Sequence, residues 1–236
     1  GARQSVEEVA VTDDRITATI YDNVRGGLTV FERGQSTWHE QHLPVPENVS
    51  VHLGDSSKKT NRVFYSVEGF LTPSTLSLAS VDDLTAETLR SAPARFDAST
   101  HVVEQFEATS SDGTRIPYFV VRPRDLAMDG SAPTIIYGYG GFQVSKPPAY
   151  IPEMGKLWLE NGGVYVNANI RGGGEFGPTW HQSVLKENRQ LAFDDYAAVA
   201  RDLHARGITS PRRTGIYGRS NGGVLTSVTM TQHPEL

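Results

Sequence analysis

The hydrophobic pattern of the chain changes near residue 100, and this change limits the possible folds more than any other feature. Upstream, short apolar segments alternate with turns rich in Gly, Asn, Asp and Pro; the segments are 16–21, 28–32, 49–53, 63–67 and 76–81. Asp22-Asn23 and Gly26-Gly27 between the first two are typical of a hairpin. Such spacing with little helical periodicity predicts an all-β region. Two four-stranded propeller blades and a β-sandwich fragment both fit it.

Downstream, strands alternate with helices. The pattern predicts a hairpin of strands 102–108 and 116–122 around Ser111-Asp112-Gly113, then buried strands at 134–137 and 164–169 and a short strand at 214–217. Helices are expected at 151–159, 193–206 and 222–233, with Asp194 and Asp195 at the N-terminus of the second and Gly207 after its last residue. This alternation predicts a mainly parallel sheet. We expect two domains, 1–98 and 99–236.

Composition excludes several classes of protein. The chain has no cysteine, which excludes disulfides, thiolate zinc sites and a cysteine nucleophile, and fits a reducing, cytoplasmic location. The net charge of −5 and the lack of a basic stretch predict no nucleic-acid partner. No apolar run is long enough to span a membrane, so no membrane partner is expected. No metal-binding or phosphate-binding motif suggests a metal or cofactor.

The sharpest motif is Gly218-Arg219-Ser220-Asn221-Gly222, which matches G-x-S-x-G. It follows a predicted strand and opens a predicted helix, which is the context that a nucleophile elbow requires. Ser220 is therefore the candidate nucleophile, and the backbone N–H of Asn221 is a natural oxyanion donor at the helix N-terminus. A glycine-rich turn without catalysis is the alternative.

A second glycine-rich loop, 137–142, follows a buried strand. Hydrolases with a nucleophile elbow need a second oxyanion donor from such a loop. A backbone N–H or the Tyr139 hydroxyl could serve as this donor. A tight turn with its tyrosines packed in the core fits equally well. A third loop, 172–177, contains G-x-G-x-x-G, but Pro178 follows at once and no apolar helical face comes after it. We therefore interpret it as a structural loop and not as a dinucleotide site.

A general base for Ser220 is harder to find. In α/β-hydrolases the triad follows the order Ser, acid, His, and only sixteen residues follow Ser220. They include His233 but no Asp. His233 lies about 20 Å along the helix that Ser220 opens, at about 1.5 Å per residue, and is therefore too far away to act as the base.

Taken together, the motifs closely resemble the prolyl oligopeptidase family of serine peptidases. The matching segments are YGYGGF at 137–142, ANIRGGGEFG at 168–177 with Trp180-His181, FDDY at 193–196, TSP at 209–211 and GRSNGG at 218–223. Upstream, DNVR at 22–25 and EGFLTP at 68–73 resemble the last blades of that family's β-propeller.

The resemblance implies both a fold and a function. It implies an α/β hydrolase domain preceded by propeller blades, and cleavage of short peptides, often after proline, without a cofactor or metal. Ser220 matches the nucleophile, the Asn221 N–H and the Tyr139 hydroxyl match the oxyanion hole, and Phe142 matches a residue of the substrate pocket. Arg219 departs from the glycine usual in prolyl members and looks more like the oligopeptidase B branch.

The family's catalytic Asp and His match no residue up to Leu236, and most of its propeller would precede Gly1. We therefore expect the chain to be truncated at both ends, inactive alone, and partnered by the remainder of the same enzyme. The alternatives are an oligopeptidase B-like peptidase or an esterase on the same scaffold, and a non-catalytic propeller binding module.

Overall fold

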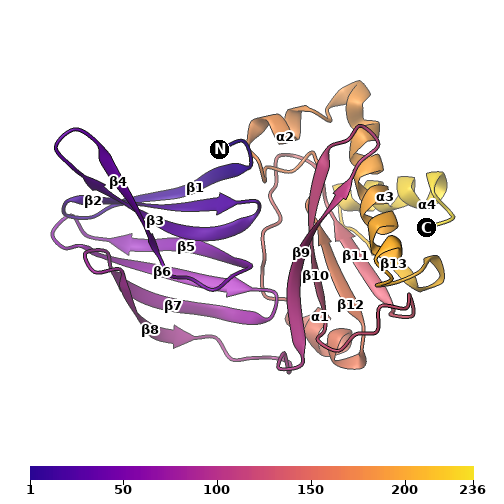
Figure 1. The fold of residues 1–236 in the computed structure, drawn as a ribbon, viewed down its shortest axis with the longest axis horizontal. Coiled ribbons are helices and arrows are strands. Elements are labelled where there is room, and N and C mark those ends of the chain that lie inside the picture. The colour runs from indigo at the N-terminus through magenta and orange to yellow at the C-terminus, as the bar shows by residue number, and fades with distance from the viewer. The chain divides into compact units, whose positions relative to one another are not determined.

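The computed structural model describes residues 1–236, which divide into two compact units. The first unit is Gly1–Ala94 with Pro147–Tyr150, and the second is Arg95–Lys146 with Ile151–Leu236. Figure 1 shows strands without helices in the first and strands with helices in the second. The assignment of 1–98 to the propeller and of 99–236 to the peptidase domain stays a prediction.

The first unit consists of two four-stranded antiparallel sheets whose strands follow chain order. One contains β1 (Gln4–Val11), β2 (Arg15–Asp22), β3 (Arg25–Arg33) and β4 (Trp38–Leu43), and the other β5 (Val49–Ser56), β6 (Arg62–Gly69), β7 (Thr72–Ser80) and β8 (Thr85–Ser91). Sequential order is typical of propeller blades, whereas a sandwich joins its strands by Greek-key connections. The sequence alone left these two alternatives open.

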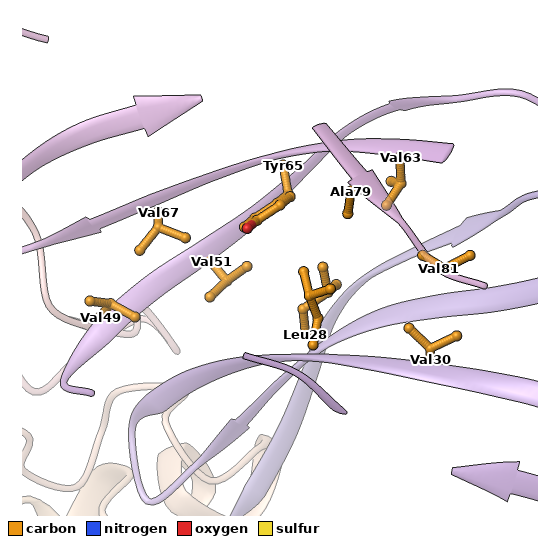
Figure 2. Packing of buried hydrophobic residues seen from close by; sticks show 10 residues of the cluster. Leu28, Val30, Val49, Val51, Val63, Tyr65, Val67, Ala79 and Val81 are labelled. Carbon is orange, nitrogen blue, oxygen red and sulfur yellow. The ribbon is translucent and has the colours of Figure 1, made fainter. Parts of the chain in front are cut away.

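Hydrophobic side chains from both sheets form one core (Figure 2). Alternate residues of β6, Val63, Tyr65 and Val67, point into it, as the period of two in a strand requires. Leu28 and Val30 of β3 meet them from the other sheet. The alternation predicted from the sequence is therefore the alternation that buries this core.

Two features of the first unit differ from the prediction. β1, β4 and β8 were not expected, because they are mainly exposed and lack apolar alternation. The hairpin between β2 and β3 is present, but its turn lies at Asn23 and Val24, whose φ angles are 47° and 70°. Gly26 and Gly27 belong to β3.

The second unit is built on a five-stranded sheet of order β13-β11-β12-β10-β9. The strands are β9 (His101–Thr109), β10 (Arg115–Pro123), β11 (Thr134–Gly138), β12 (Val164–Ala168) and β13 (Thr214–Tyr217). β11 is parallel to both β12 and β13, whereas β10 is antiparallel to β9 and β12. The sheet is therefore mixed, with only β10 opposed to the other strands. It matches the predicted α/β hydrolase arrangement, and the predicted hairpin is present as β9 and β10.

Four α-helices accompany the sheet (Figure 1). They are α1 (Pro152–Leu157), α2 (Pro178–Gln182), α3 (Gln190–Ala205) and α4 (Asn221–Gln232), with 3₁₀ turns at Leu159–Asn161, Lys186–Arg189 and Pro211–Arg213. α3 begins three residues before the predicted start, so Asp194 and Asp195 lie in its second turn and not at its N-terminus. Gly207 follows α3 at φ 70°, as predicted. None of the helices has the length and apolar composition needed to cross a membrane.

Candidate active site

Ser220 lies in a sharp turn between β13 and α4. β13 ends at Tyr217, α4 begins at Asn221, and Ser220 precedes the helix with φ 55° and ψ −120°. A residue other than glycine at positive φ is strained by about 1–3 kcal/mol, and such strain gathers at functional sites. The strand and helix predicted around the G-x-S-x-G motif are therefore both present, and the turn between them is strained.

The two outer glycines of the motif are required by close packing. A Cβ on Gly218 would lie 2.1 Å from the carbonyl oxygen of Gly222, and a Cβ on Gly222 would lie 2.6 Å from the carbonyl oxygen of Gly138. Real Cβ atoms do not approach backbone this closely. The turn therefore accepts only glycine at both positions, which keeps it tight against the end of β11.

The turn leaves a hydroxyl and an N–H group available. Ser220 is exposed, and its side chain makes no hydrogen bond to cap α4. The N–H groups of Gly222 and Gly223 donate to Arg219 O and Ser220 O, at 2.8 and 2.9 Å. The Asn221 N–H belongs to the first helical residue, so it has no partner inside the helix. It is free to receive negative charge at the positive end of the helix.

The loop after β11 reaches the same turn. β11 and β13 are parallel neighbours, paired through Tyr137 and Tyr217, so their C-terminal ends adjoin. The Asn221 Nδ2 atom donates to the backbone oxygen of Tyr139 at 2.5 Å. The structure therefore brings together three of the predicted site residues: Ser220 and Asn221 on one segment, and Tyr139 on the other.

The Tyr139 ring has a cationic neighbour. The Lys146 Nζ atom lies 4.6 Å from the centroid of this half-buried ring. The Lys146 backbone is itself held, because its carbonyl oxygen accepts from Asn167 and Asn169 at 2.8 Å each. Both ends of the 139–146 loop are thus attached to the sheet region.

Phe142 ends the glycine-rich loop and is 74% exposed. Its backbone and that of Gln143 are both left-handed, at φ 55° and 57°. The Gln143 N–H donates to Gly172 O at 3.1 Å, and the His181 Nδ1 atom lies 2.8 Å from the same oxygen. The Phe142 ring is therefore exposed on a backbone that is strained and held by hydrogen bonds.

The G-x-G-x-x-G segment forms a loop between β12 and the five-residue helix α2, in agreement with its interpretation as structural. Arg171, which precedes it, is buried and binds both carboxylate oxygens of Asp195 at 2.6 and 2.8 Å. It also binds Asp112 in the β9–β10 turn. This ion network connects three segments of the second unit.

Glu175, in the same loop, was missed in the sequence because nothing in its spacing sets it apart. Its carboxyl is buried and accepts from the Lys146 N–H at 3.0 Å and from Asn169 Nδ2 at 3.3 Å, while its Oε2 has no hydrogen-bond partner. Burial raises the pKa of the Glu175 carboxyl to about 7, against the lowering effect of these hydrogen bonds. It carries less charge at neutral pH than an ordinary glutamate.

Arg189, at the end of the turn before α3, was also missed. Its Nη1 atom donates to Gly140 O at 2.6 Å, and its Nη2 atom lies 3.4 Å from Asn221 Oδ1. A lone arginine in a polar stretch carries no sequence signal, because its contacts depend on residues 32 and 49 positions away.

The histidines and acidic groups form neither a base for Ser220 nor a metal site. His233 caps the far end of α4, where its Nδ1 atom lies 3.1 Å from Arg201 Nη2. The structure contains no group of three or more His, Asp or Glu side chains that could hold a metal ion.

Comparison with known proteins agrees with this geometry. The model for "Prolyl oligopeptidase, N-terminal beta-propeller domain" matches residues 2–92, and that for "Prolyl oligopeptidase family" matches residues 153–236. An uncharacterized peptidase of Sinorhizobium fredii is 48% identical over 99% of the chain and 32% of its own length. A prolyl endopeptidase of Elizabethkingia miricola is 39% identical over 93% of the chain and 31% of its own length.

A solved structure supports the same relationship. The post-proline cleaving enzyme from Rickettsia typhi is 40% identical, with a TM-score of 0.86 over 100% of the chain and 34% of that protein. The chain spans about a third of the length of these relatives. Since the two prolyl oligopeptidase models match residues 2–92 and 153–236, and the relatives share this fold, the chain belongs to the prolyl oligopeptidase family.

Proposed function

We propose that the chain carries the nucleophile and the oxyanion hole of a serine peptidase that cleaves short peptides after proline. The observation that carries the proposal is the strained Ser220 turn, hydrogen-bonded through Asn221 to the Tyr139 loop. A nucleophilic serine of an α/β-hydrolase occupies such a strand–turn–helix junction. The relatives named prolyl endopeptidase and post-proline cleaving enzyme support the choice of substrate.

The proposed reaction is acyl transfer. The Ser220 hydroxyl oxygen attacks the scissile carbonyl carbon while a histidine accepts its proton. The Asn221 N–H and the Tyr139 hydroxyl donate to the oxyanion that forms. The C–N bond then breaks, the histidine protonates the leaving amine, and water releases the acyl group from the serine. We propose that this histidine and the aspartate that orients it come from residues outside these 236.

Phe142 is proposed to contact the substrate. Its ring is exposed at the end of the loop that also carries Tyr139, so one loop would provide both an oxyanion donor and an apolar surface. A proline ring is apolar and rigid, and an aromatic face binds it without ordering a flexible side chain.

The test of the nucleophile is Ser220→Ala in the full-length protein, with Tyr139→Phe beside it. We expect Ser220→Ala to abolish peptide hydrolysis and labelling by a fluorophosphonate, with unchanged circular dichroism. Tyr139→Phe should lower kcat by about 10²–10³-fold, as expected for one oxyanion donor. Normal labelling of Ser220→Ala would refute the assignment, and an unreactive wild-type protein would favour a binding module.

The test of specificity uses matched fluorogenic peptides that differ only at the residue before the scissile bond. Proline should give the highest kcat/KM, above alanine and arginine. A preference for arginine would instead support the oligopeptidase B-like alternative, to which Arg219 points. Activity on aryl esters alone would support the esterase alternative.

A further inference from the structure

Two side chains outside the glycine-rich loop hold two of its consecutive carbonyl groups. Asn221 Nδ2 donates to Tyr139 O at 2.5 Å, and Arg189 Nη1 donates to Gly140 O at 2.6 Å. Arg189 Nη2 also lies 3.4 Å from Asn221 Oδ1, so the arginine contacts both the loop and the side chain that holds it. Arg189, Asn221 and the loop thus form one hydrogen-bonded set, which we name the carbonyl clamp.

The clamp determines more than the position of two oxygens. A peptide unit is planar, so fixing the Tyr139 and Gly140 carbonyls also fixes the orientation of the two peptide planes after Tyr139. The loop needs such support, because Phe142 and Gln143 both have left-handed backbones, with φ 55° and 57°. Conformations of this kind persist only where the surroundings impose them.

The charge on Arg189 is not neutralised by a carboxylate. The guanidinium is half-buried, its hydrogen bonds go to a carbonyl and an amide oxygen, and it lies 5.3 Å from the centroid of the Phe193 ring. Burial lowers the pKa of this guanidinium, which nevertheless stays far above neutral pH. A positive charge with only neutral partners remains available to stabilise negative charge that develops nearby.

We propose that Arg189 is a positioning residue of the oxyanion hole, acting through the Gly140 carbonyl and the Asn221 side chain. The inference rests on the proposed function of Ser220 and Tyr139. Arg189 holds the loop so that the Tyr139 hydroxyl stays where the oxyanion forms, and it holds the Asn221 side chain at the start of α4. It therefore acts mainly in the transition state and little in substrate binding.

The test compares Arg189→Met and Arg189→Lys in the full-length protein. Met keeps much of the apolar stem and removes the donors, whereas Lys keeps the charge and loses the planar fork. We expect Arg189→Met to lower kcat by about 10–100-fold with KM changed less than threefold, and Arg189→Lys to fall between it and the wild type. A loss confined to KM, or full activity in both variants, would overturn the proposal.

A second measurement separates positioning from simple stabilisation. In the Tyr139→Phe background, Arg189→Met should cost less than threefold more, because the hydroxyl that it positions is already absent. An undiminished loss in that background would overturn the proposal. The matched control is Arg206→Met at the other end of α3, whose guanidinium lies 4.3 Å from the Phe106 ring centroid. Its kcat should stay within twofold of the wild type.

The failure of the inference can be told from the failure of the proposed function. If Ser220→Ala abolishes fluorophosphonate labelling while Arg189→Met is labelled at the wild-type rate, the nucleophile stands and the positioning role is wrong. If Ser220→Ala is labelled normally, the proposed function itself fails. A misfolded Arg189→Met is recognised by its circular dichroism, and Arg189→Lys then decides the matter.

Discussion

At the residue scale, three strained backbone positions lie where the chemistry is proposed. Ser220, Phe142 and Gln143 have φ angles of 55° to 57°, in a region that costs a residue with a side chain about 1–3 kcal/mol. None of the three is a glycine, so their side chains are retained despite that cost. The adjoining glycines are needed because a side chain there would collide with the backbone. A Cβ on Gly218, for example, would lie 2.1 Å from the carbonyl oxygen of Gly222.

Glu175 gives a prediction about pH. Its pKa is about 7 when folded, against its usual 4.5, so below pH 4.5 the group is protonated in both states. Between pH 4.5 and 7 only the unfolded chain releases the proton, and the free energy of unfolding falls by up to about 3 kcal/mol. Glu175→Gln should remove this fall. The melting temperature of Glu175→Gln minus that of the wild type should therefore rise between pH 4.5 and 7, and this difference should stay constant above pH 7.

Thermal unfolding of the full-length protein at pH 5 and pH 8 measures this difference. Glu187→Gln, which changes an exposed glutamate in a nearby turn, is the control and should keep the wild-type pH dependence. If wild type and Glu175→Gln lose the same stability between the two pH values, the buried carboxyl does not titrate in this range.

At the element scale, the sequence predicted the strands whose residues are alternately buried. It missed the features that depend on contacts between residues far apart in the chain. β6 was predictable because alternate residues such as Val63 and Val67 are buried, whereas β8 was not, since all its residues are exposed. The spacing around Ser220 revealed the turn, because its glycines are needed locally. Arg189 was unpredictable, since its role depends on β11 and β13 being neighbours, which no local pattern encodes.

Arg171 carries the prediction at this scale, because it joins α3 to the β9–β10 turn. Its side chain is 5% exposed, that of Asp195 is fully buried, and the two are 2.6 Å apart. Arg171→Met should lower the free energy of unfolding by about 3–5 kcal/mol, since it leaves a buried carboxylate without its cation. The double variant Arg171→Met/Asp195→Leu should recover part of this loss. Urea denaturation followed by far-UV circular dichroism measures both.

The double variant decides the cause of the effect. If the double variant recovers stability, the loss in Arg171→Met came from the unpaired charge of Asp195, as expected for a buried ion pair. A double variant no more stable than Arg171→Met would instead mean that the cost did not come from the unpaired Asp195 carboxylate.

At the scale of the whole molecule, the chain has two separate cores. The first is the hydrophobic cluster between the two antiparallel sheets (Figure 2), in which Leu28 is 1% exposed. The second surrounds the mixed sheet, and Leu203 of α3 is fully buried there. Pro147–Tyr150 belongs to the first unit although its neighbours in sequence belong to the second, and Ser50 Oγ donates to Pro148 O. The chain therefore crosses between the units more than once.

Separate cores predict separate local stabilities. Leu28→Ala should cost about 2–5 kcal/mol, the usual range for a buried leucine, and Leu203→Ala a similar amount. Hydrogen exchange of the full-length protein should show faster exchange in the strands of Gly1–Ala94 for Leu28→Ala, and faster exchange in α3, β9 and β10 for Leu203→Ala, since these two strands pack against α3. Each substitution leaves a cavity in one core only. Each variant should therefore leave the amide protons of the other unit protected from exchange. Equal loss of protection in both units from either variant would mean that the two units unfold together. We would then attribute this coupling to segments such as Pro147–Tyr150, where the chain passes from one unit to the other.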